Sequence, residues 1–129
     1  MLIRCANAFI SKNKFYDLGG SALYSFNENC YNEGLGIFNL VFCDNYISNT
    51  AYIEEHGKRN FGAAFCIRTD RTEKNGEQGL RFAESRVNTN LLIENNTVNN
   101  KSRNGIVVAC AQNVIIRNNK MNKDTDAPD

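Results

Sequence analysis

The sequence has few of the features that identify the common protein classes. It contains no Trp, one Pro and one His, and its 15 basic residues nearly balance its 14 acidic residues. A balanced charge gives no electrostatic basis for binding nucleic acid or an anionic membrane surface. No apolar run approaches the roughly 20 residues that span a bilayer. The sequence therefore predicts a soluble protein that binds neither, with enough hydrophobic residues, 42%, for one folded domain.

Cysteine occurs in an odd number and without paired spacing. The residues are Cys5, Cys30, Cys43, Cys66 and Cys110. No C-x-x-C motif is present, so neither a zinc site nor a complete disulfide framework is indicated. The start of the chain also lacks the basic and apolar stretches of a secretory signal. We expect reduced thiols that pack as small apolar side chains, which favours the cytoplasm or a phage particle as location.

The most informative feature is a residue pattern that is repeated once with few changes. Residues 90–98, NLLIENNTV, are echoed 23 residues later by residues 113–121, NVIIRNNKM. A period of this length, with β-branched strands separated by Asn and Gly, is typical of a solenoid whose coils stack. The sequence thus predicts a repetitive β-structure.

Alternation within the repeated strand predicts which side chains form the core. Successive side chains of a strand face opposite sides, so Leu91 and Ile93 are expected to point inwards, and Leu92 and Glu94 outwards. The second unit repeats this pattern one coil further on. Glu94 and Arg117 then lie one coil apart on the outer face, where we expect a cross-strand ion pair.

Each unit ends at an Asn that we place at a corner of the coil. Asn tolerates left-handed backbone conformations and bonds nearby backbone groups, which suits Asn96 and Asn119 to a bend. The same residue pattern occurs twice upstream. The corner residues of the four units are Asn13, Asn45, Asn96 and Asn119. Stacked Asn side chains form hydrogen-bonded ladders in other β-structures. We therefore expect an Asn ladder along the axis, with an apolar residue two positions after each corner.

Besides these units, the sequence contains a second kind of strand and one long polar insertion. Gly-led strands recur at residues 20–23, 62–65 and 105–108, where Gly supplies a sharp entry. Their alignment predicts that Cys110 points inwards and that Cys43 and Cys66 point outwards under loops. Residues 68–89 form the longest polar insertion, within which residues 79–82 are expected to add a short strand.

These units resemble the right-handed parallel β-helix family, which includes pectate lyases, polygalacturonases, alginate epimerases and phage tailspikes. The resemblance covers residues 8–121 and implies an all-β, right-handed parallel β-helix (solenoid) of about five coils with one long loop insertion. It assigns residues 1–122 to this domain and leaves residues 123–129 as a disordered polar tail. The motifs are specific for the fold and not for a chemistry, because one fold hosts many functions.

The first residues look like the last strand of a coil whose beginning is missing. Two arrangements fit this interpretation. The chain is a fragment of a longer β-helix protein, which we favour, or it is a short protein whose open end is covered by a partner. In both cases the first rung presents an unpaired strand edge, which solenoids ordinarily cap.

The resemblance implies a protein that binds or processes a polysaccharide, and an enzyme of this kind would be a polysaccharide lyase or a glycoside hydrolase. Enzymes of this fold bind sugar chains along one outer sheet and its loops, with acids for acid/base catalysis and tyrosines for stacking. The candidate catalytic residues are Asp44, Asp70, Glu54 and His56. No cofactor is indicated. Lyases of this fold often use calcium held by clustered acids, but no dense Asp cluster is present.

Two of these candidates have simpler interpretations, which we favour over a catalytic role. Asp44 precedes a corner Asn, and a solvated carboxylate suits that turn as well as Asn does. His56 stands among charged residues, as solvated loop histidines do. Sequence alone therefore leaves the catalytic competence of the chain open.

Another observation favours a structural role. The outward side chains of the first strand column form an apolar stripe: Phe9, Val41, Leu92 and Ile115. Such a stripe is expected to be covered, either by residues 68–89 folding back, by another subunit as in trimeric tailspikes, or by the rest of a larger chain. The alternative function is therefore a non-catalytic assembly module, such as a tailspike segment, that forms a homo-oligomer through this stripe.

Overall fold

The computed structural model describes residues 6–28, 36–50, 63–71, 81–82, 88–100 and 104–123. Every element within these residues is a strand, which confirms the all-β prediction, and none of them contains a helix that could span a membrane. The strands are β1 (Ala6–Ser11), β2 (Lys14–Leu18), β3 (Leu23–Glu28), β4 (Phe38–Cys43), β5 (Tyr46–Thr50), β6 (Ala63–Arg71), β7 (Arg81–Phe82), β8 (Asn88–Glu94), β9 (Thr97–Asn100), β10 (Asn104–Val108), β11 (Ala111–Arg117) and β12 (Lys120–Lys123).

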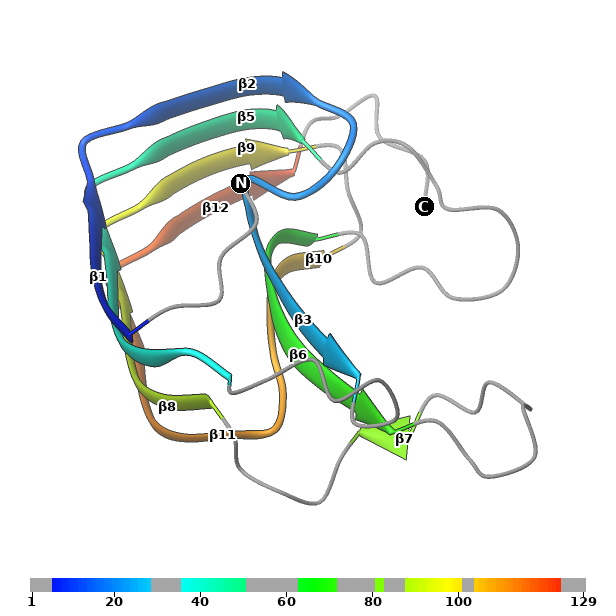
Figure 1. Ribbon diagram of the computed structural model, residues 1–129. Coiled ribbons are helices and arrows are strands. Elements are labelled where there is room, and N and C mark those ends of the chain that lie inside the picture. Colours follow the sequence, from blue (N-terminus) through cyan, green and yellow to red (C-terminus); the bar gives the residue numbers. More distant parts are fainter. Residues whose placement is uncertain are drawn as a thin grey trace.

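The strands form three sheets, which surround a common interior as three walls (Figure 1). The first sheet has the order β1-β4-β8-β11, the second β2-β5-β9-β12 and the third β3-β6-β10. The chain visits the three sheets in turn, and all neighbours within these orders are parallel. Only a chain that winds repeatedly around one axis gives this combination of order and direction, so the molecule is consistent with the predicted β-solenoid.

The interior follows the predicted alternation. Leu91 and Ile93 of β8 are buried, whereas Leu92 between them is half-buried on the outer side. Apolar side chains from all three walls meet in the interior, and its largest buried members are Phe42, Phe65, Leu23, Ile37, Leu40, Ile47, Ile67, Leu91, Ile93 and Val98. Phe42 contacts the ring of Phe65 at 4.7 Å and the ring of Phe15 at 6.1 Å between centroids. The three walls are thus joined by one continuous core.

The long insertion is shorter than predicted. Strand β6 continues to Arg71, and β8 begins at Asn88, because both ends of the expected loop are used to extend parallel pairs. Within it, β7 forms the expected short strand and pairs antiparallel with the end of β6. This described part of the insertion therefore lies beside the third sheet and not on the outer face of the first.

Of the three Gly-led strands, the first two have the predicted register, with Leu23 beside Phe65, and only β10 differs from it. Ile106 lies beside Phe65, which shifts β10 by two residues from an alignment of Gly105 with Gly62. A shift of two keeps every side chain on its own face, so the hydrophobic pattern cannot detect it. Cys110 is a half-buried bend residue with φ of 56°, and not an inward strand residue as predicted.

Candidate functional site

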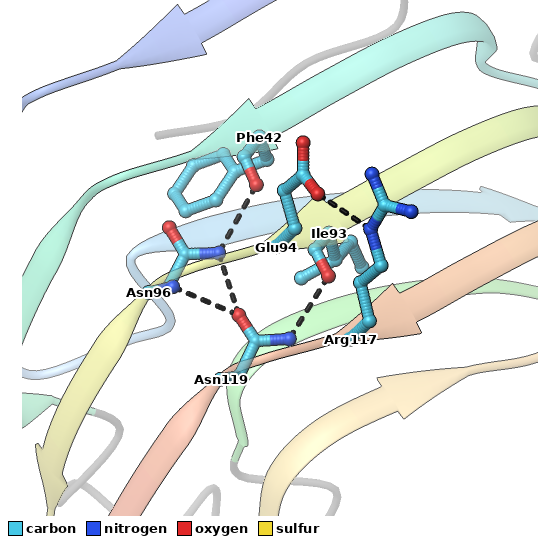
Figure 2. A network of polar contacts seen from close by, with 6 residues as sticks. All are labelled: Phe42, Ile93, Glu94, Asn96, Arg117 and Asn119. Carbon is cyan, nitrogen blue, oxygen red and sulfur yellow. Dashed lines mark hydrogen bonds and ion pairs between the residues drawn. The ribbon is translucent and has the colours of Figure 1, made fainter.

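The predicted corner ladder is present, and Figure 2 shows its last step from Asn96 to Asn119. At each step the backbone N–H and the side-chain Nδ2 of one Asn donate to Oδ1 of the Asn in the next rung, at 2.9 to 3.1 Å. The Nδ2 of Asn96 also donates to the carbonyl of Phe42 in the preceding rung, at 3.0 Å. Asn45 and Asn96 are buried, so these bonds satisfy polar groups that water does not reach.

The left-handed backbone conformation of the corner belongs to the residue before the ladder Asn. Lys12, Asp44, Asn95 and Asn118 have φ between 54° and 57°. The prediction that placed this conformation at Asn96 and Asn119 was therefore wrong by one residue. The turn rotates the next side chain into the interior, where it is held by the ladder. Asp44 occupies one of these exposed turn positions, in agreement with its simpler interpretation.

A second Asn ladder, which the sequence reasoning missed, runs along the outer surface of the first sheet. It is formed by Asn7, Asn39, Asn90 and Asn113, each with φ between 53° and 58°. Nδ2 of each later Asn donates to Oδ1 of the one in the rung before, at 2.8 to 3.0 Å. The signal was present in the sequence, because an Asn directly precedes the first inward residue of all four units.

The outer face of the second sheet combines aromatic and amide side chains. Tyr16 is 49% exposed, and its ring lies 5.6 Å from that of Tyr46 in a tilted arrangement. Nδ2 of Asn99 donates to the Tyr46 hydroxyl at 2.8 Å, and Nδ2 of Asn122 donates to Oδ1 of Asn99 at 2.6 Å. Lys14 and Lys120 lie in the same column as Tyr46. We call Tyr16, Tyr46, Asn99 and Asn122 the tyrosine-amide face.

The outer face of the first sheet carries the predicted apolar stripe. The register places Phe9 beside Val41, Val41 beside Leu92, and Leu92 beside Ile115. Phe9 is 71% and Ile115 53% exposed, while Val41 and Leu92 are half-buried. The expected ion pair flanks the stripe, with Nε of Arg117 at 2.6 Å from Oε2 of Glu94 (Figure 2). Apolar side chains are therefore aligned on this wall and remain accessible to water.

The structure does not bring the two described catalytic candidates together. Asp44 lies at the corner between β4 and β5, and Asp70 lies in β6 of the third sheet, where its Cα is paired with those of Glu28 and Phe82. Glu54 and His56 lie outside the described residues. The residues that are described contain no group of three His, Cys, Asp or Glu that could hold a metal ion.

Cys43 occupies an outward register position but is only 7% exposed. Burial raises the pKa of its thiol above the ordinary value of 9.0, and a hydrogen bond to Asp44 and the negative charges of Asp44 and Glu94 act in the same direction, opposed by Lys12. The thiol is thus protonated at neutral pH and is a poor nucleophile. Cys43, Cys66 and Cys110 are reduced thiols outside any disulfide, as expected, and Cys5 and Cys30 lie outside the described residues.

The burial of β6 explains the position of Cys66. This residue stands in an outward column between Tyr24 and Val107, yet it is 1% exposed. Residues 63–67 are all buried, so both faces of this strand are covered, as in central strands of parallel sheets. The outer face of the third wall is therefore covered at β6, whereas its outward neighbours Tyr24 and Val107 are half-buried.

Comparison of the chain with protein-family models, with curated protein sequences and with solved structures finds no match.

Proposed function

We propose that the protein binds a polysaccharide along the tyrosine-amide face of the second sheet. The observation that carries the proposal is the exposed Tyr16 ring beside Tyr46, continued along the stack by the amides of Asn99 and Asn122. An aromatic ring offers an apolar surface to the C–H face of a sugar, and an amide supplies both donors and acceptors for hydroxyl groups. These are the two kinds of contact that a sugar chain requires.

The geometry of the solenoid suits a polymer more than a single sugar. Coils stack at intervals of about 4.8 Å, so equivalent side chains recur along the axis at a regular spacing. Tyr16, Ser48, Asn99 and Asn122 form one such outward row. Lys14 and Lys120 in the adjacent row add positive charge, which favours a chain that carries uronate carboxylates. The proposed ligand is therefore an extended acidic polysaccharide.

The described residues support polysaccharide binding, and the predicted candidates among them supply no catalytic pair for its cleavage. Most glycoside hydrolases use two carboxyl groups about 5 to 9.5 Å apart across the scissile bond. Asp44 and Asp70 lie on different sides of the coil, which gives the described residues no such pair from these candidates. A lyase or hydrolase activity that uses Asp44, Asp70, Glu54 or His56 remains a prediction from the resemblance.

We infer a right-handed, pectate-lyase-like β-helix of about five coils, because parallel strands joined by a crossover connect with right-handed geometry in nearly all proteins. The described strands supply three successive triplets and a final pair. A crystal structure of the chain is the direct test of hand and of coil number.

Replacing Tyr16 with Ala tests the binding face. Tyr16→Ala is expected to weaken polysaccharide binding about tenfold, or about 1.4 kcal/mol, because the stacking surface is removed. The measurement is affinity electrophoresis or calorimetry against a panel of neutral and uronate-containing polysaccharides. Phe9→Ala is the matched control, since Phe9 is an exposed aromatic residue on another wall. Equal losses in both variants, or no binding by the wild type to any member of the panel, would contradict the proposal.

The exposed apolar stripe favours a second candidate function, assembly into a homo-oligomer. Phe9 and Ile115 are exposed at its two ends, with Val41 and Leu92 between them. Burial of aligned apolar side chains drives subunit association. This candidate concerns the first sheet, so it is compatible with polysaccharide binding on the second.

Leu92→Glu tests the assembly candidate. If the stripe forms the interface, the wild-type protein is expected to be a dimer or trimer by light scattering. Leu92→Glu is expected to be monomeric, because a carboxylate takes the place of the apolar methyl groups of Leu. Circular dichroism of the variant shows whether the fold is kept. A wild-type monomer across the measured concentration range excludes a stable interface at this stripe.

A further inference from the structure

The described coils are open at the end formed by β11 and β12. These strands are the last members of their sheets, after β8 and β9. Ile116 and Met121 occupy the inward columns of Ile93 and Val98, which are buried, but are themselves 46% and 41% exposed. A further rung on this end would cover them as the existing rungs cover their neighbours.

The opposite end, formed by β1 and β2, also has inward apolar side chains that are incompletely covered. Ala8 and Ile10 of β1 and Phe15 of β2 are inward residues that pack on the core but remain only half-buried. Strands β1 and β2 are the outermost members of the same two sheets. Each end therefore offers two parallel strand edges around an incompletely covered apolar interior.

The two Asn ladders give each end a defined hydrogen-bonding character. In the interior ladder, the backbone N–H of each Asn donates towards the β11–β12 end, which leaves the N–H of Asn119 as the terminal donor and Oδ1 of Asn13 as the terminal acceptor. In the exterior ladder the direction is opposite. Within the described part of the chain, Oδ1 of Asn113 is its terminal acceptor and Nδ2 of Asn7 its terminal donor.

We propose that the β11–β12 end of one molecule binds the β1–β2 end of a second copy, so that the coils stack head to tail. In this arrangement Asn119 donates to Asn13 of the next copy, and Asn7 of that copy donates to Asn113. Strand β1 continues the first sheet beside β11 in the parallel direction, and β2 continues the second sheet beside β12. Both ladders and both sheets then run across the junction without interruption.

The head-to-tail arrangement is the one that the ladder directions select. Two identical ends facing one another would place their strands antiparallel, and neither ladder would continue. Charges at the proposed junction neither favour nor oppose head-to-tail association. The continued register sets Lys123 opposite Asp17 and Lys120 opposite Lys14. The favourable pair and the unfavourable pair nearly cancel. Apolar burial and the amide bonds therefore carry the association.

The proposed contact is heterologous and does not close on itself. Such contacts generate open chains, so the average mass is expected to rise continuously with protein concentration and not to stop at a dimer. Oligomerisation through the apolar stripe would instead give a closed assembly of fixed size. The two modes of association are therefore distinguishable by mass alone.

Adjacent residues of β11 provide a matched pair of variants. Ile116 points into the interior and Ile115 outwards to the stripe, and the two are similarly exposed. We expect Ile116→Lys to abolish concentration-dependent association in sedimentation velocity runs. Ile115→Lys is expected to weaken it much less, because the continued register places Ile115 beside Phe9 of the next copy on the outer face, where the Lys ammonium group remains in water. Circular dichroism and thermal melting serve as checks that both variants fold. Loss of association in Ile115→Lys alone would overturn the proposal, as would a wild-type protein that stays monomeric at every concentration.

Mixing two blocked variants tests the polarity directly. Ala8→Lys blocks the β1–β2 end, and Ile116→Lys blocks the β11–β12 end. Each variant alone is expected to be monomeric, while the mixture forms a one-to-one dimer through the two intact ends. Self-association of either variant alone would show that identical ends bind one another, and a mixture without dimers would show that the ends do not bind. Either result rejects head-to-tail stacking.

Discussion

Replacing Asn96 with Ala is expected to lower the free energy of unfolding by about 3 to 5 kcal/mol. The buried side chain accepts from the backbone N–H and Nδ2 of Asn45 and donates to the carbonyl of Phe42 and to Oδ1 of Asn119. Ala leaves these groups without partners in a site that excludes water, at about 1 to 3 kcal/mol for each unsatisfied group. Since domains of this size have only about 5 to 15 kcal/mol in total, the variant is expected to be largely unfolded at modest urea concentrations.

The matched control for this variant is Asn90→Gly. Asn90 belongs to the exterior ladder, where water replaces the lost side-chain bonds, and Gly tolerates its φ of 58°. We expect a change within about 1 kcal/mol. Urea unfolding followed by circular dichroism measures both variants. Equal destabilisation by the two substitutions would show that burial of the interior ladder is not what makes it stabilising.

The difference between the two ladders also explains what could be predicted from the sequence. The interior corner admits few residue types, because the side chain must accept from a backbone N–H and donate to a backbone carbonyl of the preceding rung at once. Asn13 and Asn45 were therefore identified correctly even though they are separated from Asn96 and Asn119 by stretches of unequal length. The exterior ladder was missed because the two upstream units were aligned from their first apolar residue, so that Asn7 and Asn39 were not compared with Asn90 and Asn113.

The errors occurred where physical constraints leave several residue types equally acceptable. The left-handed turn position is occupied by Lys12 and Asp44 as well as by Asn95 and Asn118, so residue type alone does not identify it. The position of β10 was wrong by two residues because a two-residue shift preserves the alternation. Both faces of β6 are buried, so this strand has no alternation to follow.

The candidate site was less predictable than the fold. Tyr16 and Tyr46 differ in sequence position within their strands, and only the parallel register of β2 and β5 brings their rings together. Asn99 and Asn122 were outside the residues selected for chemistry, because an amide three positions after a corner Asn looks like part of a turn. Surface function on a solenoid depends on which residues stack in a column, and this requires the register of every rung.

Phe42→Ala is the second substitution with a large expected effect. Phe42 is fully buried, and its ring contacts Phe15 of the second sheet and Phe65 of the third. Removing it is expected to cost about 3 to 5 kcal/mol of unfolding free energy, from lost apolar burial and from the cavity that remains. The measurement is again urea unfolding, with the slope compared between variants to detect changes in the unfolded state.

Phe38→Ala is its control, because Phe38 belongs to the same strand but is 47% exposed. Its removal is expected to cost less than about 1 kcal/mol, since the lost apolar area is partly in water already. In a solenoid each rung contacts only its neighbours, so a cavity at Phe42 loosens its contacts to Phe15 in the preceding rung and to Phe65 in its own rung at once. If Phe42→Ala were as mild as Phe38→Ala, the three walls would not share a continuous core, and stability would have to come from the Asn ladder and the sheets alone.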